Sequence, residues 1–424
     1  MSDFDINYKI GKTEKNEIIF DIIGNKNNGL DKSIINSLRR ILLTQINTIS
    51  FDINNIYIDK NTSSMHNEFL KDRISLIPLY IDPDTYDYSY IFEIKIKNTN
   101  DPILKIKSSN FIIYPLNENG KYKIQNQKQI LLDGGVISES DDIYKLIKEN
   151  PKEYFNMDQP ISDKEKEIII KPTIIRNKKY FIDITELKLT NSDVNIQELN
   201  LYCIPIQGIG IEHAKFNNIS KSIYTFKKNK KLFEEEFKKY SILNKIPEKN
   251  LKKEKNTFEI EKSERYFYRD VFNEPYYYEF TIKSNHFYNP YQLFKISIDI
   301  LMNDLNNFKN KINRINKEED YTIATIENFK NPNTYQMKIQ NETHNILSII
   351  QNYAVRYHIN DDSFILVMGY KQYHILDNIM LINLMIKPND YEEIQKINFI
   401  IEFINNIIDN INKDLNIMKN KWNY

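Results

Sequence analysis

The chain has 424 residues, enough for about three folding units of ~150 residues each. Its 58 basic and 58 acidic residues give a net charge of zero, which argues against a protein that grips nucleic acid by itself, although a local basic patch can still exist. The single cysteine, Cys203, excludes an internal disulfide bond and a cysteine-ligated zinc site. Its apolar neighbours predict a buried filler.

The first ten residues, MSDFDINYKI, lack a basic stretch followed by an apolar run, so we expect no signal peptide. No apolar run approaches the ~20 residues of a membrane-spanning helix. The abundance of Ile, Asn, Lys and Tyr indicates a coding bias toward A and T, and much of the Asn and Lys is therefore expected to be surface filler. A reducing, intracellular location fits the presence of a single cysteine.

The first fifty residues predict two strands and a helix. Residues 4–23 predict strand, turn and strand, and Asp31 is placed to cap a helix that runs to about residue 46. Arg39 and Arg40 lie inside this helix. The apolar stem of Arg39 is expected on partly covered surface, where a guanidinium needs a carboxylate or a carbonyl as its partner.

The sequence pattern changes from about residue 50 to residue 181. Segments in which apolar and polar residues alternate are separated by turns such as 117–120, and they predict a strand-rich unit. Residues 167–175 are one of its predicted strands. Residues 64–79 inside it predict a short helix that Pro78 ends. Two further strands follow, and the charge-dense segment 227–264 predicts a solvated surface insertion with helical pieces.

Two apolar stripes with alternating steps of three and four residues predict long helices with a narrow packing seam. The first consists of Phe294, Ile298, Leu301, Leu305, Phe308, Ile312 and Ile315, and the second of Ile394, Ile397, Ile401, Ile404, Ile408, Ile411, Leu415, Met418 and Trp422. Residues 322–340 between them predict a hairpin, residues 343–357 a helix, and two more strands precede the second stripe. Asn389 and Glu392 have the spacing of a capping box before the last helix.

The order of elements repeats along the chain. Residues 1–50 with 190–315 read as strands, helix, strands and long helix, and residues 316–424 read the same way. We therefore predict two similar α+β modules in tandem, the first interrupted by an inserted strand-rich domain at 51–189.

The local sequences around the first helix resemble the alpha-like subunits of multisubunit RNA polymerases. That family comprises bacterial alpha, the archaeal D subunit and the third subunit of eukaryotic polymerase II. The matching positions are Leu38, Arg39, Arg40, Ile41, Leu42 and Leu43, then His66, Glu68, Phe69, Leu70, Arg73, Leu76, Ile77, Pro78 and Leu79, and finally Gly208, Ile209, Gly210, Glu212, His213, Ala214, Lys215 and Phe216.

The C-terminal part resembles the smaller partner of that family, the eleventh subunit of eukaryotic polymerase II and the archaeal L subunit. The matching positions are Glu342, His344, Ile346, Ile349 and Ile350, then Gly369, Tyr370, Lys371, His374 and Leu376. Gln351 stands where the family has an arginine, which puts an arginine contact of the second module in doubt. Such fusions occur in polymerases of large DNA viruses, in which case the location would be the host cytoplasm and the virion.

The resemblance implies an α+β fold of two alpha-like dimerisation modules packed through a four-helix interface. The packing residues it implies are Leu38, Leu42, Leu301, Leu305, Phe308, Ile350, Ile401, Ile404 and Ile408. It also implies a non-catalytic assembly platform that recruits the second-largest and largest polymerase subunits, besides small subunits, and meets DNA and RNA only indirectly. The residues expected to contact the large subunits are Arg39, Arg40, His66, Glu68, Phe69, Arg73 and Lys371.

No catalytic, cofactor or metal motif stands out. The six histidines show no paired metal spacing, and residues 208–213 lack the third glycine of a dinucleotide fingerprint, so we expect hydrogen-bonded structural histidines and no cofactor. No homo-oligomer and no membrane contact is expected. The alternatives are a fused alpha-like scaffold that serves another complex and an enzyme hidden in the inserted domain.

Overall fold

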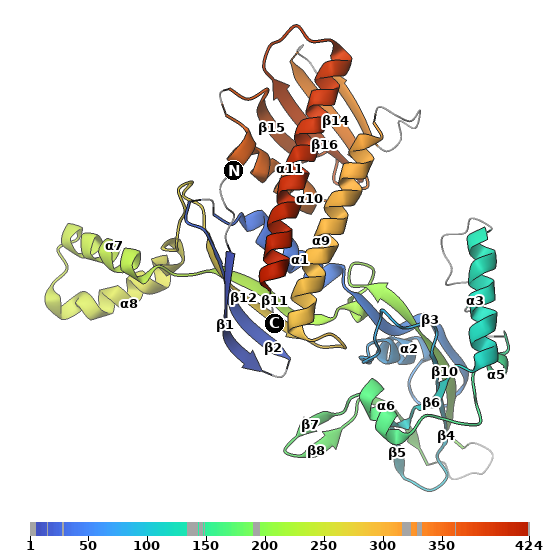
Figure 1. The fold of residues 1–424 in the computed structure, drawn as a ribbon. Helices are drawn as coiled ribbons and strands as arrows, with labels where there is room; N and C mark the ends of the chain where they lie inside the picture. The colour runs from blue at the N-terminus through green and yellow to red at the C-terminus, as the bar shows by residue number, and fades with distance from the viewer. Residues whose placement is uncertain are drawn as a thin grey trace. The chain divides into compact units, whose positions relative to one another are not determined.

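The computed structural model describes residues 6–422 apart from 15, 28, 134–142, 144–146, 148, 190–195, 316–323, 329–332 and 361. The chain groups into two compact units (Figure 1). Unit 1 comprises Met1–Leu43, Ile219–Ser284 and Asn289–Tyr424, and unit 2 comprises Thr44–Asn218 and Asn285–Tyr288.

Unit 1 begins with a four-stranded antiparallel sheet in the order β1-β2-β12-β11. Its strands are β1 (Ile6–Glu14), β2 (Glu17–Gly24), β11 (Ile219–Phe226) and β12 (Tyr277–Ser284). Ile18, Phe20 and Ile22 alternate along β2 and are fully buried, so one face of the sheet carries the core. The strand, turn and strand predicted near the N-terminus are confirmed.

Two helices belong with this first sheet. They are α1 (Lys32–Thr44) and α9 (Pro290–Asn313). The Asp31 side chain accepts a hydrogen bond from the Ser33 amide at 2.7 Å, which confirms the predicted cap of α1. Asn289 and Gln292 form a capping box at the start of α9.

A second four-stranded antiparallel sheet in unit 1 has the order β13-β14-β16-β15. Its elements are β13 (Ala324–Asn328), β14 (Thr334–Gln340), α10 (His344–Tyr353), β15 (Ile365–Gln372), β16 (Ile379–Ile386) and α11 (Glu393–Lys421). Taken in chain order, its strands occupy the same positions as those of the first sheet. A π-helical turn (Ala354–His358) ends α10. The hairpin turn is predicted at 330–333, and residues 330–332 of it lie outside the described residues.

The capping box before α11 lies three residues later than predicted. Glu392, paired with Gln395, is the cap. The Asn389 side chain instead accepts a hydrogen bond from the Tyr391 amide at 3.1 Å, so it closes a local turn before the helix begins.

Unit 2 contains a four-stranded antiparallel sheet and two small two-stranded antiparallel sheets. The sheet order is β3-β10-β4-β6, and the pairs are β5-β9 and β7-β8. The strands are β3 (Asn47–Asn61), β4 (Tyr90–Lys97), β5 (Ile103–Lys107), β6 (Ile112–Pro115), β7 (Thr173–Ile175), β8 (Lys178–Tyr180), β9 (Asp183–Lys188) and β10 (Glu198–Ile209). Cys203 is fully buried in the core with Phe51 and Phe92, and burial raises the pKa of its thiol. The predicted filler role is confirmed.

Unit 2 holds more helix than the sequence predicts. Its helices are α2 (Asn67–Ser75), α3 (Glu118–Asp133), α5 (Pro151–Tyr154) and α6 (Asp163–Ile169), besides the 3-10 turns Ser108–Asn110 and Ala214–Phe216. The predicted turn at 117–120 is wrong. The Asn117 side-chain oxygen accepts a hydrogen bond from the Gly120 amide and so caps the start of α3. The predicted strand 167–175 begins only at Thr173, because a capping box of Ser162 and Glu165 makes the preceding residues helical.

The charge-dense segment 227–264 folds as two helices between β11 and β12. They are α7 (Lys230–Leu243) and α8 (Leu251–Lys262), with the 3-10 turns Glu248–Asn250 and Ser263–Arg265 beside α8. Its helical character is confirmed.

The grouping into units differs from the predicted boundaries. Residues 44–50 and 196–218 fall in unit 2 because β10 pairs with both β3 and β4. The rest of the first predicted module, apart from residues 285–288, groups with the second in unit 1, where α9 packs on α11.

Candidate functional site

The predicted seam of α9 is buried along its whole length. Leu301, Leu305 and Phe308 are fully buried, as are Phe294, Ile298 and Ile312. Ile315 lies beyond the last helical residue and is partly buried. The period of three and four therefore placed this stripe correctly.

The seam of α11 is buried only in part. Ile404 and Ile408 are fully buried, but Ile401 is partly exposed and Ile394 is 68% exposed. Ile400 and Ile407 are fully buried instead. The reason is that α11 packs against α10 as well as α9, so its buried face is wider than a two-helix seam. Leu38 and Leu42 on α1 and Ile350 on α10 are also buried.

Four polar pairs flank the α9–α11 seam at one constant register, and we call them the polar ladder. Steps of seven, three and four residues along α9 match the same steps backward along α11, so the helices run antiparallel (Figure 1). The four pairs are Asp299–Lys419, Asn306–Asn412 at 2.9 Å, Lys309–Asp409 at 2.6 Å and Asn313–Asn405 at 2.7 Å.

The apolar seam and the polar ladder contribute differently to the α9–α11 contact. Burial of the seam supplies most of the favourable free energy, since each fully buried aliphatic or aromatic side chain contributes roughly 1.5–3 kcal/mol. The Oδ1 atoms of Asn405 and Asn412 are buried without a hydrogen-bond partner among the described residues. Such atoms cost free energy, so the asparagine pairs serve register more than stability. A shift of one helix along the other breaks all four pairs at once.

The end of α11 is anchored on the first sheet. The Trp422 ring lies 4.7 Å from the Phe20 ring and 4.6 Å from the Phe294 ring, centroid to centroid. Its indole N–H donates to the Tyr291 carbonyl at 3.0 Å, and the Tyr8 hydroxyl donates to the Met418 carbonyl at 3.1 Å. The indole therefore has both an apolar site and a hydrogen-bond partner. Residues from β1, β2, α9 and α11 thus meet in one aromatic cluster.

A buried ion cluster links three other segments of unit 1. The Arg356 guanidinium, from the turn after α10, pairs with the Asp270 carboxylate and lies 3.6 Å from the Asp31 carboxylate at the start of α1. The Asp270 side chain is fully buried. Gly29 has a φ of +63°, and a Cβ there would collide with the guanidinium, so both backbone and space require glycine. The cluster ties the N-terminal segment, the loop before β12 and the C-terminal part together.

Sequence reasoning missed Arg356, although a signal was present. Arg356 follows Ile349 by seven residues and Tyr353 by three, so it continues the buried stripe of α10. A charged residue on a buried stripe needs an ionic partner inside the protein. The resemblance drew attention to Gln351 instead.

The two arginines of α1 differ in environment. Arg39 is half-buried, and its Nε donates to the Asn36 amide oxygen at 3.1 Å. Its partner is thus an amide one turn back rather than a carboxylate. Arg40 is exposed. On the second sheet of unit 1, Lys371 is exposed on β15.

Helix α2 of unit 2 brings four predicted contact residues together. His66 caps the helix by accepting from the Glu68 amide at 3.4 Å, and the Arg73 guanidinium donates to the Asp183 carbonyl at 2.7 Å. Leu70 and Ile74 face the core. Phe69 is 67% exposed and Leu76 is 63% exposed, seven residues apart and hence on one side. The helix therefore has a second apolar face that this unit leaves uncovered.

Several histidines make hydrogen bonds that hold local structure. The Nδ1 atoms of His213 and His374 accept from the amides of Lys215 and Leu376 at 3.1 and 3.2 Å. His344 bonds Gln372 at 3.2 Å. Burial lowers the pKa of His286 to about 4, which keeps that ring neutral.

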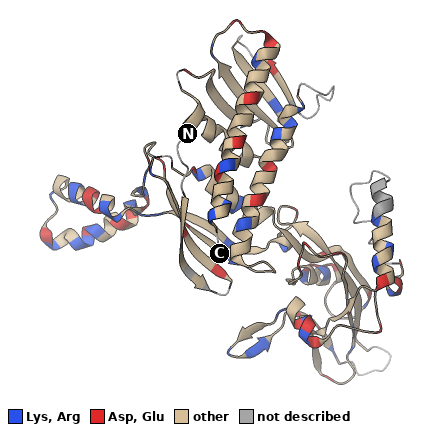
Figure 2. Cartoon of the chain, in the orientation of Figure 1, with Lys and Arg blue, Asp and Glu red and all other residues tan. Residues whose placement is uncertain are grey.

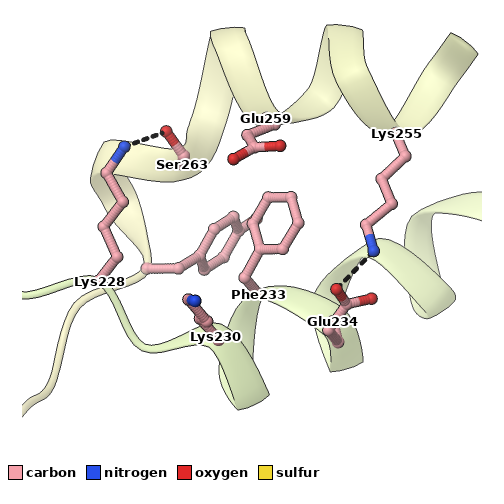
Figure 3. Close-up of a pocket in the computed structure, with 8 residues that line it drawn as sticks. Lys228, Lys230, Phe233, Glu234, Lys255, Glu259 and Ser263 are labelled. Atoms are coloured by element: carbon pink, nitrogen blue, oxygen red, sulfur yellow. Dashed lines mark hydrogen bonds and ion pairs between the residues drawn. The ribbon is translucent and has the colours of Figure 1, made fainter. Parts of the chain in front are cut away.

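A cavity of about 250 Å³ lies between α7 and α8 (Figure 3). Its lining is Lys228, Lys230, Phe233, Glu234, Lys255, Glu259, Ser263 and Tyr266. Lys228 bonds Ser263 and Glu264, and Lys255 pairs with Glu234. With both signs of charge present and largely paired, the lining selects no particular ligand.

Within the described ranges, no group of three or more His, Cys, Asp or Glu side chains could hold a metal ion. A search of the same residues finds no helix with the length and apolar character of a membrane span.

Comparisons with known proteins agree on one family. A family model described as the RNA polymerase Rpb3/Rpb11 dimerisation domain matches residues 26–305. The chain is 32% identical over 113 residues to the DNA-directed RNA polymerases I and III subunit rpac1 of Dictyostelium discoideum. This match covers 24% of this chain and 31% of that protein. It is 31% identical over 87 residues to the human subunit RPAC1, covering 20% of this chain and 23% of that protein.

An archaeal relative gives a shorter and more similar match. The chain is 43% identical over 58 residues to the DNA-directed RNA polymerase subunit Rpo3 of Methanosphaera stadtmanae, covering 14% of this chain and 21% of that protein. The chain thus spans about a third or less of the length of the curated relatives it matches.

Proposed function

The chain belongs to the RNA polymerase Rpb3/Rpb11 dimerisation-domain family, and we propose that it is a non-catalytic assembly subunit of a multisubunit DNA-directed RNA polymerase. In this proposal one chain carries two alpha-like modules. The first comprises β1, β2, α1, β11, β12 and α9, interrupted by an inserted domain. The second comprises β13 to β16 with α10 and α11.

The sheets support the pairing of modules. Both have four antiparallel strands, and in each the first two strands pair, the fourth in chain order pairs with the second, and the third is at the edge. Each sheet is accompanied by a short helix after its second strand and a long helix after its fourth. Two copies of one topology in one chain are what a fusion of two related subunits would contain.

One contact carries the proposal: α9 pairs with α11 inside the chain through a buried seam and the polar ladder. Separate subunits have to find each other in solution, whereas linkage makes the encounter intramolecular at ~mM effective concentration. In this reading the seam joins the modules and leaves other surfaces for outside partners.

In this proposal, α2 and the arginines of α1 bind the other polymerase subunits. The uncovered face around Phe69 and Leu76 has the apolar character of an interface core, and Arg73 and Glu68 supply a polar rim. We assign the contact with the second-largest subunit, and then the largest, to this face and to Arg39, Arg40, His66 and Lys371. Polymerisation would belong to those partners, and the chain would work wherever that polymerase transcribes, which for a viral source is the host cytoplasm and the virion.

Purification of the tagged chain from its native cells tests the proposal. We expect the two largest polymerase subunits to be recovered with it, and incubation of the chain alone with template and NTPs to yield no RNA. Recovery in another complex, without large polymerase subunits, would support a scaffold for a different assembly and contradict the proposal.

A second experiment tests the modules. Residues 1–315 and 316–424, co-expressed as two chains, should purify together through α9 and α11. Separate elution of the two fragments, each folded by circular dichroism, would contradict the internal pairing of modules without touching the family assignment.

A further inference from the structure

Helices α7 and α8 form a folded arm that the proposed function does not use. Phe258 lies at the centre of an aromatic cluster, with ring centroids 5.5 Å from Phe237, 4.9 Å from Tyr240 and 5.9 Å from Tyr266. Phe237 and Phe258 are buried. Because this cluster joins both helices and the turn after them, the arm presents its far end, residues 241–249, as a defined surface that we call the apex.

The outer half of the arm is strongly basic although the chain is neutral. Residues 238–255 contain seven lysines and two glutamates. Lys239 pairs with Glu236, and Lys255 pairs with Glu234. The other five lysines form no ion pair with any residue in the described part of the chain; they are Lys238, Lys245, Lys249, Lys252 and Lys253. Figure 2 shows basic and acidic residues alternating along the two helices.

The apex also exposes apolar side chains. Ile242 is 77% exposed and Leu243 is 83% exposed at the end of α7. The chain reverses directly after them, with the Ile246 amide donating to the Ser241 carbonyl at 3.0 Å and Lys245 at a φ of 50°. Two large aliphatic side chains thus project from a hydrogen-bonded turn, within a segment of the chain that carries the five unpaired lysines.

We propose that the apex docks an acidic amphipathic segment of a partner protein. Ile242 and Leu243 would enter its apolar face, and the unpaired lysines would meet its carboxylates, which is the arrangement of an apolar interface core with a polar rim. The charge of the arm is complementary to such a segment and repels a basic one.

Nucleic acid fits the apex less well. A phosphate backbone offers no apolar surface to cover Ile242 and Leu243. Stacking on bases uses exposed aromatic or arginine side chains, whereas residues 227–264 contain no arginine and the rings of Phe237 and Phe258 are packed inside the arm.

The contact would be small and electrostatically assisted. A single apex buries less than the ~1,200 Å² of a stable interface, so we expect weak, fast exchange rather than a permanent complex. Exposed charges lose most of their attraction when the Debye length falls from ~10 Å at 0.1 M salt to ~3 Å at 1 M salt. Binding should therefore weaken markedly as salt rises.

The test uses the full chain and a synthetic probe. The probe is a fluorescent helical peptide with leucines on one face and glutamates on the other, measured by fluorescence anisotropy. We expect the double variant Ile242→Asp/Leu243→Asp to weaken binding about ten-fold or more, which corresponds to about 1.4 kcal/mol. The charge-reversal variant Lys249→Glu/Lys252→Glu should weaken it similarly at low salt and less at high salt.

Matched variants at other places on the arm provide the controls. Ile260→Asp removes an equally exposed aliphatic side chain, 84% exposed on α8, and Lys230→Glu/Lys231→Glu makes the same charge change at the start of α7. Both should leave binding unchanged. Circular dichroism of each variant separates loss of docking from loss of the arm.

Several outcomes would overturn the docking surface. They are the absence of binding to the acidic peptide, equal losses in apex and control variants, and tighter apex-dependent binding of single-stranded DNA, RNA or anionic vesicles than of the peptide. No polymerase subunit enters this assay, so its result is independent of the function proposed above.

Discussion

The α9–α11 seam and the outer face of α2 are both apolar, yet only one of them is covered. Leu301, Leu305 and Phe308 are fully buried within unit 1, whereas Phe69 of unit 2 is 67% exposed. An apolar helical face needs a partner, but its pattern does not say whether that partner belongs to the same chain. The seam finds its partner internally, and the α2 face stays uncovered within its unit.

The polar residues beside the two surfaces differ in the same way. Along the seam, the polar ladder pairs side chain with side chain across two helices. On α2, Arg73 bonds a backbone carbonyl and His66 a backbone amide of its own unit. The first arrangement selects one helix at one register, and the second only holds α2 in shape.

Replacement of one phenylalanine on each surface tests most directly whether the seam is covered and the α2 face is not. Phe308→Ala removes a fully buried ring and should lower the free energy of unfolding by about 3–5 kcal/mol. Phe69→Ala should change it by less than about 0.5 kcal/mol, because that ring is exposed. Urea titration of both variants measures the difference. Equal destabilisation would mean that the α2 face is covered within the chain.

The buried cluster offers a slightly smaller effect in unit 1. Arg356→Leu leaves the Asp270 carboxylate buried without its cation and should cost about 3 kcal/mol. The double variant Arg356→Leu/Asp270→Asn removes the stranded charge and should regain part of that loss in the same titration. If the double variant loses more free energy of unfolding than the two single variants lose together, the ion pair is not the reason for the loss.

The polar ladder should respond to charge exchange. Lys309→Asp places two carboxylates opposite each other at the site of the 2.6 Å pair and should cost about 1 kcal/mol or less, because both side chains are partly exposed. Adding Asp409→Lys restores the pair in reverse and should recover the loss. If a double-mutant cycle finds no coupling between the two positions, this pair does not help to fix the register of α9 and α11.

The smallest effect concerns Asp414, on α11 beside the seam. Its carboxylate accepts from the Tyr353 hydroxyl at 3.0 Å, and burial raises the pKa of Asp414 from 3.8 to about 6. Because the folded state binds this proton more tightly, the carboxyl contributes stability that is fully present below about pH 4 and lost as the pH rises through about 6.

The variant Asp414→Asn should therefore gain stability relative to the unmodified chain as the pH rises from about 4 to about 7, by less than ~1 kcal/mol because the site keeps partial solvent access. Thermal melting across this range measures it. Asp362→Asn, at an exposed position, is the matched control and should follow the unmodified chain. A parallel profile for Asp414→Asn would show that this carboxyl does not titrate in that window.

Much of unit 1 could be predicted from local patterns. The stripe from Phe294 to Ile312 and the Asp31 cap follow from spacing and capping chemistry within a few residues. The composition of the charged segment indicated helical pieces, but it did not give the number or the bounds of the two helices. Where prediction went wrong, at 117–120 and 167–169, a capping side chain favoured helix where the local composition favoured turn or strand.

The candidate site was less predictable. The four contact residues on α2 follow from the resemblance, and their role stays a prediction. Arg356 was missed because its partners Asp31 and Asp270 lie far from it in the sequence. The polar ladder was missed because asparagine and lysine are so common in this chain that single positions carry no signal.

The sequence by itself determined the helical period, the Asp31 cap and the family of this chain, because these depend on residues close together or on motifs in fixed order. Only the tertiary structure decided which residues of α11 are buried, since Ile400 and Ile407 respond to α10 as well as α9. It alone paired the helices residue by residue, because register is a property of two distant segments in contact.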